Sequence, residues 1–318
     1  MNEQELKDYK KGPTFGPFIF LIDKKEGETS FDVIRKFKKI FGKKRLGKIG
    51  HFGTLDPFAT GLLMIGIGGS TRLNQYIDDY SKEYIATGIL GVRSPTGDLT
   101  CNEEDLIHSE ISETITKEDV IKALESFIGP YEQAPHSYSA AKHEGKKLYE
   151  WARAGVEIKK DKVLRHIHDI ELLKFDKFEL TFRVVVSHGT YIRVLMEDIA
   201  GKLHTIGVLK SLRRSKVGHM TVENTLSSGD ISVENAPVLL EKALGVQSLL
   251  DIEKIDLGKV DNSRYNQGQR IRTKLMDGMY WIVEKDYIYG LGTVKEGILS
   301  SLVNFQPPAM TSLIDADQ

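Results

Sequence analysis

The chain has 318 residues, 40% of them hydrophobic and 28% charged, as in folded globular proteins of one large or two unequal domains. The formal net charge of −1 argues against a uniformly basic nucleic-acid binder, and the single cysteine, Cys101, excludes a disulfide framework. The polar N-terminus lacks the apolar core of a signal peptide, and no run of about 18 apolar residues could span a membrane, so the expected location is the cytoplasm.

The first half of the chain alternates between strand and helix patterns. Residues 1–15 are predicted to be a disordered tail. The sequence then predicts a buried strand at 18–22, a helix at 31–41 with Thr29 or Ser30 as N-cap, a strand at 62–67, a helix up to residue 76 and a strand at 81–91. An amphipathic helix at 116–128 opens on Thr116 and Asp119, a capping-box pattern.

The second half of the chain predicts strands from residue 165 and from 178, then a helix at 194–203. His166 and His168 invite a metal site, but no further ligands recur at suitable spacing, and structural zinc needs about four. Residues 224–249 are predicted to be largely helical and to form a domain boundary. The short runs and frequent turns of 250–306 predict a small β-barrel, and 307–318 a tail.

The string His51–Gly61 holds one carboxylate, Asp56, among turn-forming and small residues. Gly53 permits backbone angles that are closed to other residues, and Pro57 pushes Asp56 towards an extended geometry. These constraints predict a rigid loop, which suits catalysis. The alternative is an ordinary Asx-type turn in which the carboxylate only bonds nearby main chain.

Two runs of the chain are locally basic. Residues 35–48 hold eight Lys or Arg and no acid, and residues 210–216 hold four positive charges and no acid. A solvated surface is the ordinary explanation of such a run. A ridge that binds RNA phosphates beside the Asp56 loop is the alternative.

Three segments resemble the signatures of the TruB-type tRNA pseudouridine synthases, which isomerise one uridine in the TΨC arm of tRNA. They are residues 50–63, 133–153 and 187–193. A looser match at 265–299 resembles the PUA-type RNA-binding domain of the bacterial members. The chain departs from the family's pattern at five positions: Lys25, Met64 and His136 stand where Pro is usual, and Phe52 and Ser94 where Thr is usual.

The resemblance implies an α+β fold. Residues 16–249 would form the pseudouridine synthase domain, a mixed and largely antiparallel sheet flanked by helices, and residues 250–306 a β-barrel-like PUA domain. Asp56 matches the catalytic aspartate, Arg193 the arginine that pairs with it, and Tyr84 the tyrosine that stacks on the target base.

Four further residues are implied to bind substrate. His51 matches the residue that wedges into the RNA loop, and Leu212 lines the uridine pocket. Lys24 lies near the active site in the family, where we expect it to have a supporting role. Tyr191 is two residues from Arg193, so on a strand the two side chains would share one face.

The implied activity is conversion of uridine to pseudouridine at position 55 of tRNA. It involves neither a redox step nor phosphoryl transfer, so no cofactor or metal is expected. The expected partner is the T-arm stem-loop, bound by a monomer that needs no membrane and no protein partner. The alternatives are a guide-RNA-dependent relative, against which the short C-terminal domain counts, and a non-catalytic tRNA-binding or tRNA-folding module, against which the set Asp56, Tyr84 and Arg193 counts.

Overall fold

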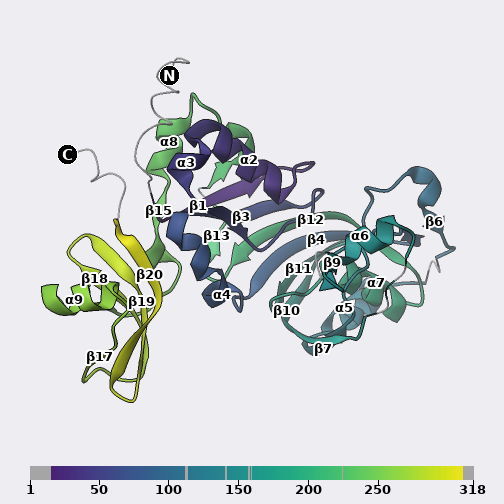
Figure 1. Cartoon of the computed structure of the whole chain (residues 1–318). Helices are drawn as coiled ribbons and strands as arrows, with labels where there is room; N and C mark the ends of the chain where they lie inside the picture. Colours follow the sequence, from purple (N-terminus) through teal and green to yellow (C-terminus); the bar gives the residue numbers. More distant parts are fainter. Residues whose placement is uncertain are drawn as a thin grey trace. The chain divides into compact units, whose positions relative to one another are not determined.

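The computed structural model describes residues 16–310 apart from 112–113, 140–141, 157, 159 and 224 (Figure 1). The tail expected at residues 1–15 lies outside this part of the chain. The chain divides into two compact units. The first unit comprises the chain up to Pro57, Leu62–Asp78 and the chain from Val222 onward, and the second comprises Phe58–Gly61 and Asp79–Thr221.

The sheet of the first unit is centred on β1 (Phe18–Lys24), the strand expected from the apolar run. Its neighbours are β14 (Leu226–Ser227), which is parallel to it, β15 (Leu244–Gly245), which is antiparallel, and β3 (Thr60–Ile67). Strand β2 (Ile49–Phe52) pairs with β3 and brings the chain to the Asp56 loop.

Helix α2 (Ser30–Phe41) closes the core of the first unit. Its predicted apolar face is confirmed: Val33, Ile34, Phe37, Ile40 and Phe41 are all buried. The ring centroid of Phe37 lies 5.1 Å from that of Phe20 in β1. A short helix, α3 (Lys43–Leu46), follows.

The region 224–249 differs from the expected largely helical segment. It contains β14 and β15 with η3 (Ser228–Asp230), η4 (Val246–Ser248) and one six-residue helix, α8 (Ala236–Glu241). Both short strands hydrogen-bond to β1, so tertiary pairing overrides the local helical pattern. The segment up to residue 76, expected to be one helix, consists of a 3₁₀ helix, η1 (Gly68–Leu73), followed by a short α-helix, α4 (Asn74–Ile77).

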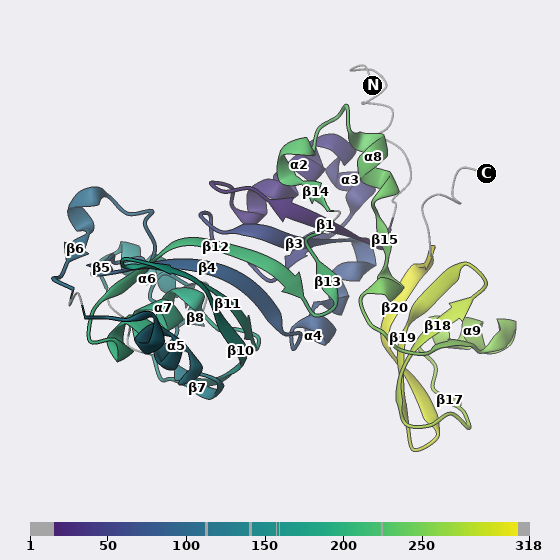
Figure 2. The same cartoon turned by 180° about the vertical axis from the view of Figure 1, so that it is seen from behind.

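The second unit is an antiparallel sheet in the order β12–β4–β11–β10–β7 (Figure 2). These strands are β12 (Gly207–Val217), β4 (Lys82–Leu90), β11 (Glu179–Val186), β10 (Val163–Asp176) and β7 (Gly129–Gln133). Helix α7 (Ile192–Lys202) packs on β12 and α5 (Lys117–Glu125) on β10. The capping box expected for α5, from Thr116 and Asp119, is confirmed.

The remaining short elements of the second unit are β5 (Val92–Arg93), η2 (Glu103–Asp105), β6 (Ile107–His108), β8 (Lys142–His143), β9 (Lys146–Lys147), α6 (Leu148–Arg153) and β13 (Met220–Thr221). A Cβ on Gly88 of β4 would lie 2.1 Å from the Met196 sulfur, so the Met196 side chain of α7 occupies the space that this glycine leaves open.

The C-terminal part of the first unit is the expected small β-domain. Its sheet has the order β16–β18–β19–β20–β17, with α9 (Gly258–Asn266) against it. The strands are β16 (Lys254–Asp256), β17 (Ile271–Arg272), β18 (Gly278–Glu284), β19 (Tyr287–Lys295) and β20 (Ile298–Met310). Tyr265, Tyr280 and Leu299 belong to its core. Residues 307–310, which were expected to belong to a tail, are part of β20, which pairs with β19 up to Met310. The expected α+β class is confirmed.

Candidate active site

The loop that carries Asp56 is held by its main chain on both sides. Before Asp56, the buried hydroxyl of Ser30 accepts a hydrogen bond from the Leu55 N–H (3.0 Å) and donates one to the Leu55 carbonyl oxygen (3.1 Å). After it, the Pro57 carbonyl oxygen accepts from the Gly27 N–H (2.9 Å). Asp56 itself is half-buried. A carboxylate between two anchored residues has little freedom, as the sequence predicted for this loop.

The two hydroxyl residues before α2 have separate tasks. Thr29 is the N-cap: its Oγ1 accepts from the Asp32 N–H (3.1 Å), and the Asp32 carboxylate accepts from the Thr29 N–H (2.9 Å). Ser30 is the first residue of the helix, and its hydroxyl faces the Asp56 loop. The sequence left the cap open between the two residues, and the structure assigns it to Thr29.

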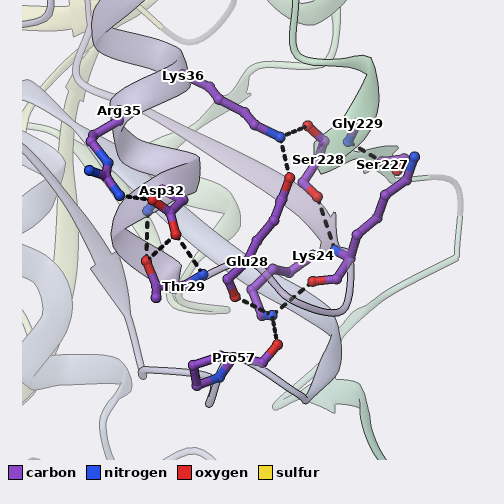
Figure 3. A network of polar contacts seen from close by, with 11 residues as sticks. Lys24, Glu28, Thr29, Asp32, Arg35, Lys36, Pro57, Ser227, Ser228 and Gly229 are labelled. Carbon is purple, nitrogen blue, oxygen red and sulfur yellow. Dashed lines mark hydrogen bonds and ion pairs between the residues drawn. The ribbon is translucent and has the colours of Figure 1, made fainter.

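Lys24 is fully buried, and its ammonium also fixes the loop (Figure 3). Nζ donates to the carbonyl oxygens of Lys25 (2.9 Å), Glu28 (2.7 Å) and Pro57 (3.2 Å). These bonds use the donors that a substrate contact would need, so the geometry favours the supporting role rather than direct binding of substrate.

A charged network surrounds the Lys24 segment (Figure 3). The carboxylate of Glu28 pairs with Lys36, whose Nζ also donates to the Ser228 carbonyl oxygen (2.8 Å). Burial raises the pKa of Glu28, but hydrogen bonds from Lys36 and Ser228, together with the positive charges of Lys36 and Lys24, outweigh burial and lower the pKa below its usual value. Glu28 is therefore held as a carboxylate beside two ammonium groups.

Tyr84 and Leu212 are neighbours on one face of the β4–β12 pair. Tyr84 lies opposite Arg214, and Leu212 lies opposite Ala86, two residues further along β4. Opposite residues of antiparallel strands share a face, so Tyr84 and Leu212 are diagonal neighbours. Both are buried. The structure thus brings together the residue expected to stack on the base and the residue expected to line its pocket.

Tyr191 and Arg193 lie at the start of a helix and not on a strand, so the expectation that they share a strand face is wrong. Tyr191 is the N-cap of α7, and Arg193 is in its first turn. Gln133 explains the turn: its side-chain amide accepts from the Tyr191 N–H (2.7 Å) and donates to the Tyr191 carbonyl oxygen (2.9 Å). These bonds satisfy the polar main-chain groups of Tyr191 without a partner strand.

The Arg193 guanidinium is buried and joins two loops of the second unit. Nη1 donates to the Thr96 carbonyl oxygen (2.6 Å) and lies 3.6 Å from the Asp98 carboxylate, and Nη2 donates to the Tyr138 carbonyl oxygen (3.0 Å). Asp98 in turn accepts from the Thr100 N–H (3.0 Å). A buried guanidinium with this many partners has one defined orientation.

His51 lies in β2, opposite Ile65 of β3, and is partly buried. Asp56, Lys24 and His51 belong to the first unit, and Tyr84, Tyr191, Arg193 and Leu212 belong to the second.

Within the described residues, no group of three or more His, Cys, Asp or Glu side chains is arranged to hold a metal ion. The segment of His166 and His168 is part of the strand β10, as expected.

Comparison with known proteins identifies the family. Residues 38–192 match the sequence model of the TruB family pseudouridylate synthase (N terminal domain). A tRNA pseudouridine synthase B of Mycoplasma mobile is 35% identical over 285 residues, which cover 89% of this chain and 93% of that protein. A tRNA pseudouridine synthase B of Desulfotalea psychrophila is 41% identical over 243 residues, which cover 73% of this chain and 94% of that protein. The chain belongs to the TruB family of pseudouridylate synthases.

Solved structures show the same fold at lower sequence identity. A chain in the structure of an H/ACA RNP bound to a substrate RNA containing 2′-deoxyuridine superposes with a TM-score of 0.64 and 20% identity, covering 94% of this chain and 86% of that one. A chain of a Cbf5–Nop10–Gar1 complex superposes with a TM-score of 0.65, also at 20% identity, with the same coverage. The fold of this TruB-family chain is thus that of the pseudouridine synthases, and its curated relatives identify it as a pseudouridine synthase, which is an isomerase. None of its described helices has both the length and the apolar character needed to cross a bilayer.

The two basic runs of this TruB-family chain have different surroundings. In the run 35–48, the charges of Arg35 and Lys36 are paired with nearby acids, whereas Lys39, Lys43, Lys44 and Lys48 are exposed on α2, α3 and the loop after them. In β12, Lys210 pairs with Glu179 (2.6 Å), Lys216 lies 3.6 Å from Glu83, and Arg214 is buried. Two of the four positive charges in β12, those of Lys210 and Lys216, therefore lie close to acids of neighbouring strands.

The sequence did not predict the contacts of three residues that organise the site: Ser30, Asp98 and Gln133. Each acts on the main chain or side chain of a residue far away in the sequence. Their residue types alone predict turns and caps, so the sequence does not indicate which distant residues they contact.

Proposed function

We propose that this protein converts uridine to pseudouridine at position 55 in the TΨC loop of tRNA, with Asp56 as the catalytic carboxylate. Relatives that match most of the chain are named tRNA pseudouridine synthase B, which supports tRNA as the substrate. The observation that carries the role of Asp56 is the main chain anchored on both sides of it by Ser30, Gly27 and Lys24. A reacting carboxylate needs such a fixed position.

The reaction breaks the bond between C1′ of the ribose and N1 of the base, and forms a bond between C1′ and C5. Positive charge develops at C1′ when the first bond breaks, and a carboxylate can stabilise it or attack it. Removal of the 2′ proton to give a glycal is the other route. Both routes give Asp56 the central role, and both end with loss of the proton from C5.

The other residues of the proposal hold and orient the RNA. Tyr84 would stack on the target base, with Leu212 beside it in the same pocket. The target uridine is stacked inside the folded arm, so it has to be flipped out at a cost of a few kcal/mol. We assign to His51 the wedge that fills the vacated position, and to Arg193 the charge that partners the carboxylate.

The exposed lysines of α2, α3 and the following loop supply the proposed phosphate contacts. Lys39, Lys43, Lys44 and Lys48 are exposed there. Phosphate contacts are independent of base sequence, so these lysines would add affinity but no choice of uridine. The protein is proposed to act alone as a monomer, without cofactor or metal, on an isolated T-arm stem-loop.

The test is single-turnover pseudouridine formation on an unmodified tRNA transcript, with purified protein and no other RNA or protein. Asp56→Asn keeps the shape of the side chain but removes its charge, so it should abolish turnover and leave tRNA binding within about threefold of wild type, because the proposed phosphate contacts lie on other residues. Asp119→Asn, an exposed helix-capping acid of the second unit, is the matched control and should keep turnover. Substantial product from Asp56→Asn would remove Asp56 as the catalyst. Activity that appears only with an added guide RNA would assign the protein to the guide-dependent class.

A further inference from the structure

His136, which has no role in the chemistry above, is linked to the Arg193 guanidinium through one residue. The Nδ1 atom of His136 accepts a hydrogen bond from the Tyr138 N–H (3.0 Å). The carbonyl oxygen of the same Tyr138 accepts from Arg193 Nη2 (3.0 Å). One residue, Tyr138, is thus held by the imidazole at its N–H and by the guanidinium at its carbonyl. His136 and Arg193 are both more than nine-tenths buried.

The imidazole is also fixed on its other edge. Gly97 has a φ of +72°, and a Cβ at this position would lie 3.2 Å from His136 Nε2 and 3.2 Å from Arg193 Cβ. The glycine therefore leaves just enough room for the ring beside the arginine. A residue with a side chain at position 97 would push the ring or the arginine away.

The charge state of His136 suits an acceptor. Burial, together with the positive charges of Arg193 and Arg93, lowers its pKa to about 4, against the opposing effect of Asp98. A neutral imidazole has one acceptor and one donor nitrogen. Because Nδ1 accepts from an N–H, the proton of the neutral ring is on Nε2.

We propose that His136 is a positioning residue for the isomerisation: its Nδ1 fixes Tyr138, whose carbonyl oxygen in turn fixes the guanidinium of Arg193. The inference rests on the proposed function, which makes Arg193 part of the active site. His136 stands where the signature that this segment resembles has proline, and a proline side chain carries no hydrogen-bond acceptor. In this role His136 acts through the Tyr138 main chain and not on the substrate.

Two substitutions separate the hydrogen bond from the bulk of the ring. In His136→Asn, the amide oxygen takes the place of Nδ1 and can accept from the Tyr138 N–H. In His136→Gln, the amide lies where Nε2 was, and the acceptor at the Nδ1 position is lost. The ring borders an open cavity of about 560 Å³, so neither shorter side chain leaves a closed void.

The expected result is a split between the two variants in single-turnover rate at saturating tRNA. His136→Gln should lose about tenfold, the factor that belongs to one hydrogen bond of ordinary strength, and His136→Asn should recover most of that loss. The dissociation constant for tRNA should stay within about threefold for both, because the phosphate contacts lie elsewhere. Equal rates in the two variants, fast or slow, would overturn the proposal, since a role of the ring in packing alone predicts no difference.

A second measurement does not depend on activity or on the folding of any variant. The ¹⁵N NMR signals of the His136 ring in the wild-type protein at pH 7 should show an unprotonated Nδ1 and a protonated Nε2, and a proton on Nδ1 would overturn the proposal. The Asp56→Asn variant keeps the two proposals distinct. Turnover by that variant would refute the role of Asp56, whereas an inactive Asp56→Asn together with equal His136 variants would refute only the role of His136.

Discussion

The substitution Ser30→Ala tests whether the hydrogen bonds of Ser30 hold the Asp56 loop in the position that catalysis needs. It removes one oxygen atom, which bonds both the N–H and the carbonyl of Leu55. Both bonds are buried, and each group left unsatisfied costs about 1–3 kcal/mol. We therefore expect the free energy of unfolding to fall by about 2–4 kcal/mol, as the sum of two such groups after some relaxation.

Thr29→Ala is the matched control because it removes the neighbouring hydroxyl. Thr29 caps α2 at an exposed site, and its loss should cost about 1 kcal/mol. Urea unfolding followed by circular dichroism measures both changes. Single-turnover kinetics at saturating tRNA should show a drop of about tenfold to a hundredfold for Ser30→Ala, the range caused by a misplaced reacting group, with the tRNA dissociation constant unchanged. The rate of Thr29→Ala should stay near wild type. If the two variants were equally stable and equally fast, Ser30 would be an ordinary first-turn serine, and other contacts would hold the Asp56 loop in place.

Three further predictions concern charge, protonation and backbone geometry. Neutralising Lys43, Lys44 and Arg45 should flatten the salt dependence of tRNA binding, since log K falls by about 0.9 per log unit of salt for each neutralised phosphate in duplex regions; an unchanged slope would make this run an ordinary solvated surface. Burial holds the pKa of His136 at about 4, below its ordinary 6.5, so its neutral form stabilises the fold fully above pH 6.5, and up to about 3 kcal/mol should be lost as the pH falls to about 4. Urea unfolding across that range should show a weaker pH dependence for His136→Asn than for wild type, and equal dependence would contradict the burial. Gly61→Ala should lower the unfolding free energy by more than about 3 kcal/mol in the same assay, because Gly61 has a φ of +101° and a Cβ there would lie 2.2 Å from a main-chain oxygen of β12; a mild effect would show that β3 and β12 can separate locally.

The sequence by itself determined the local features of the fold, which depend on residues close together in the chain. The apolar period of 31–41 predicted both helix α2 and its buried face, and the Thr116–Asp119 pattern predicted the cap of α5. The glycine and proline around Asp56 predicted a constrained loop. Helical periodicity, capping and turn preference are properties of a few adjacent residues, so they can be read in order along the chain.

Only the tertiary structure decided which residue acts on which. Ser30 and Leu55 are 25 positions apart, and Arg193 is 55 positions from Tyr138 and 97 from Thr96. The same holds for Tyr191, which became a helix cap because Gln133 satisfies its main chain, and for the lysines of β12, which meet acids on other strands. Such contacts depend on how strands and helices pack, and packing is set by the burial of side chains summed over the whole unit. No local pattern of residues carries that information, because a buried N–H or carbonyl group can form a hydrogen bond with any suitably placed partner, whatever its distance in the sequence.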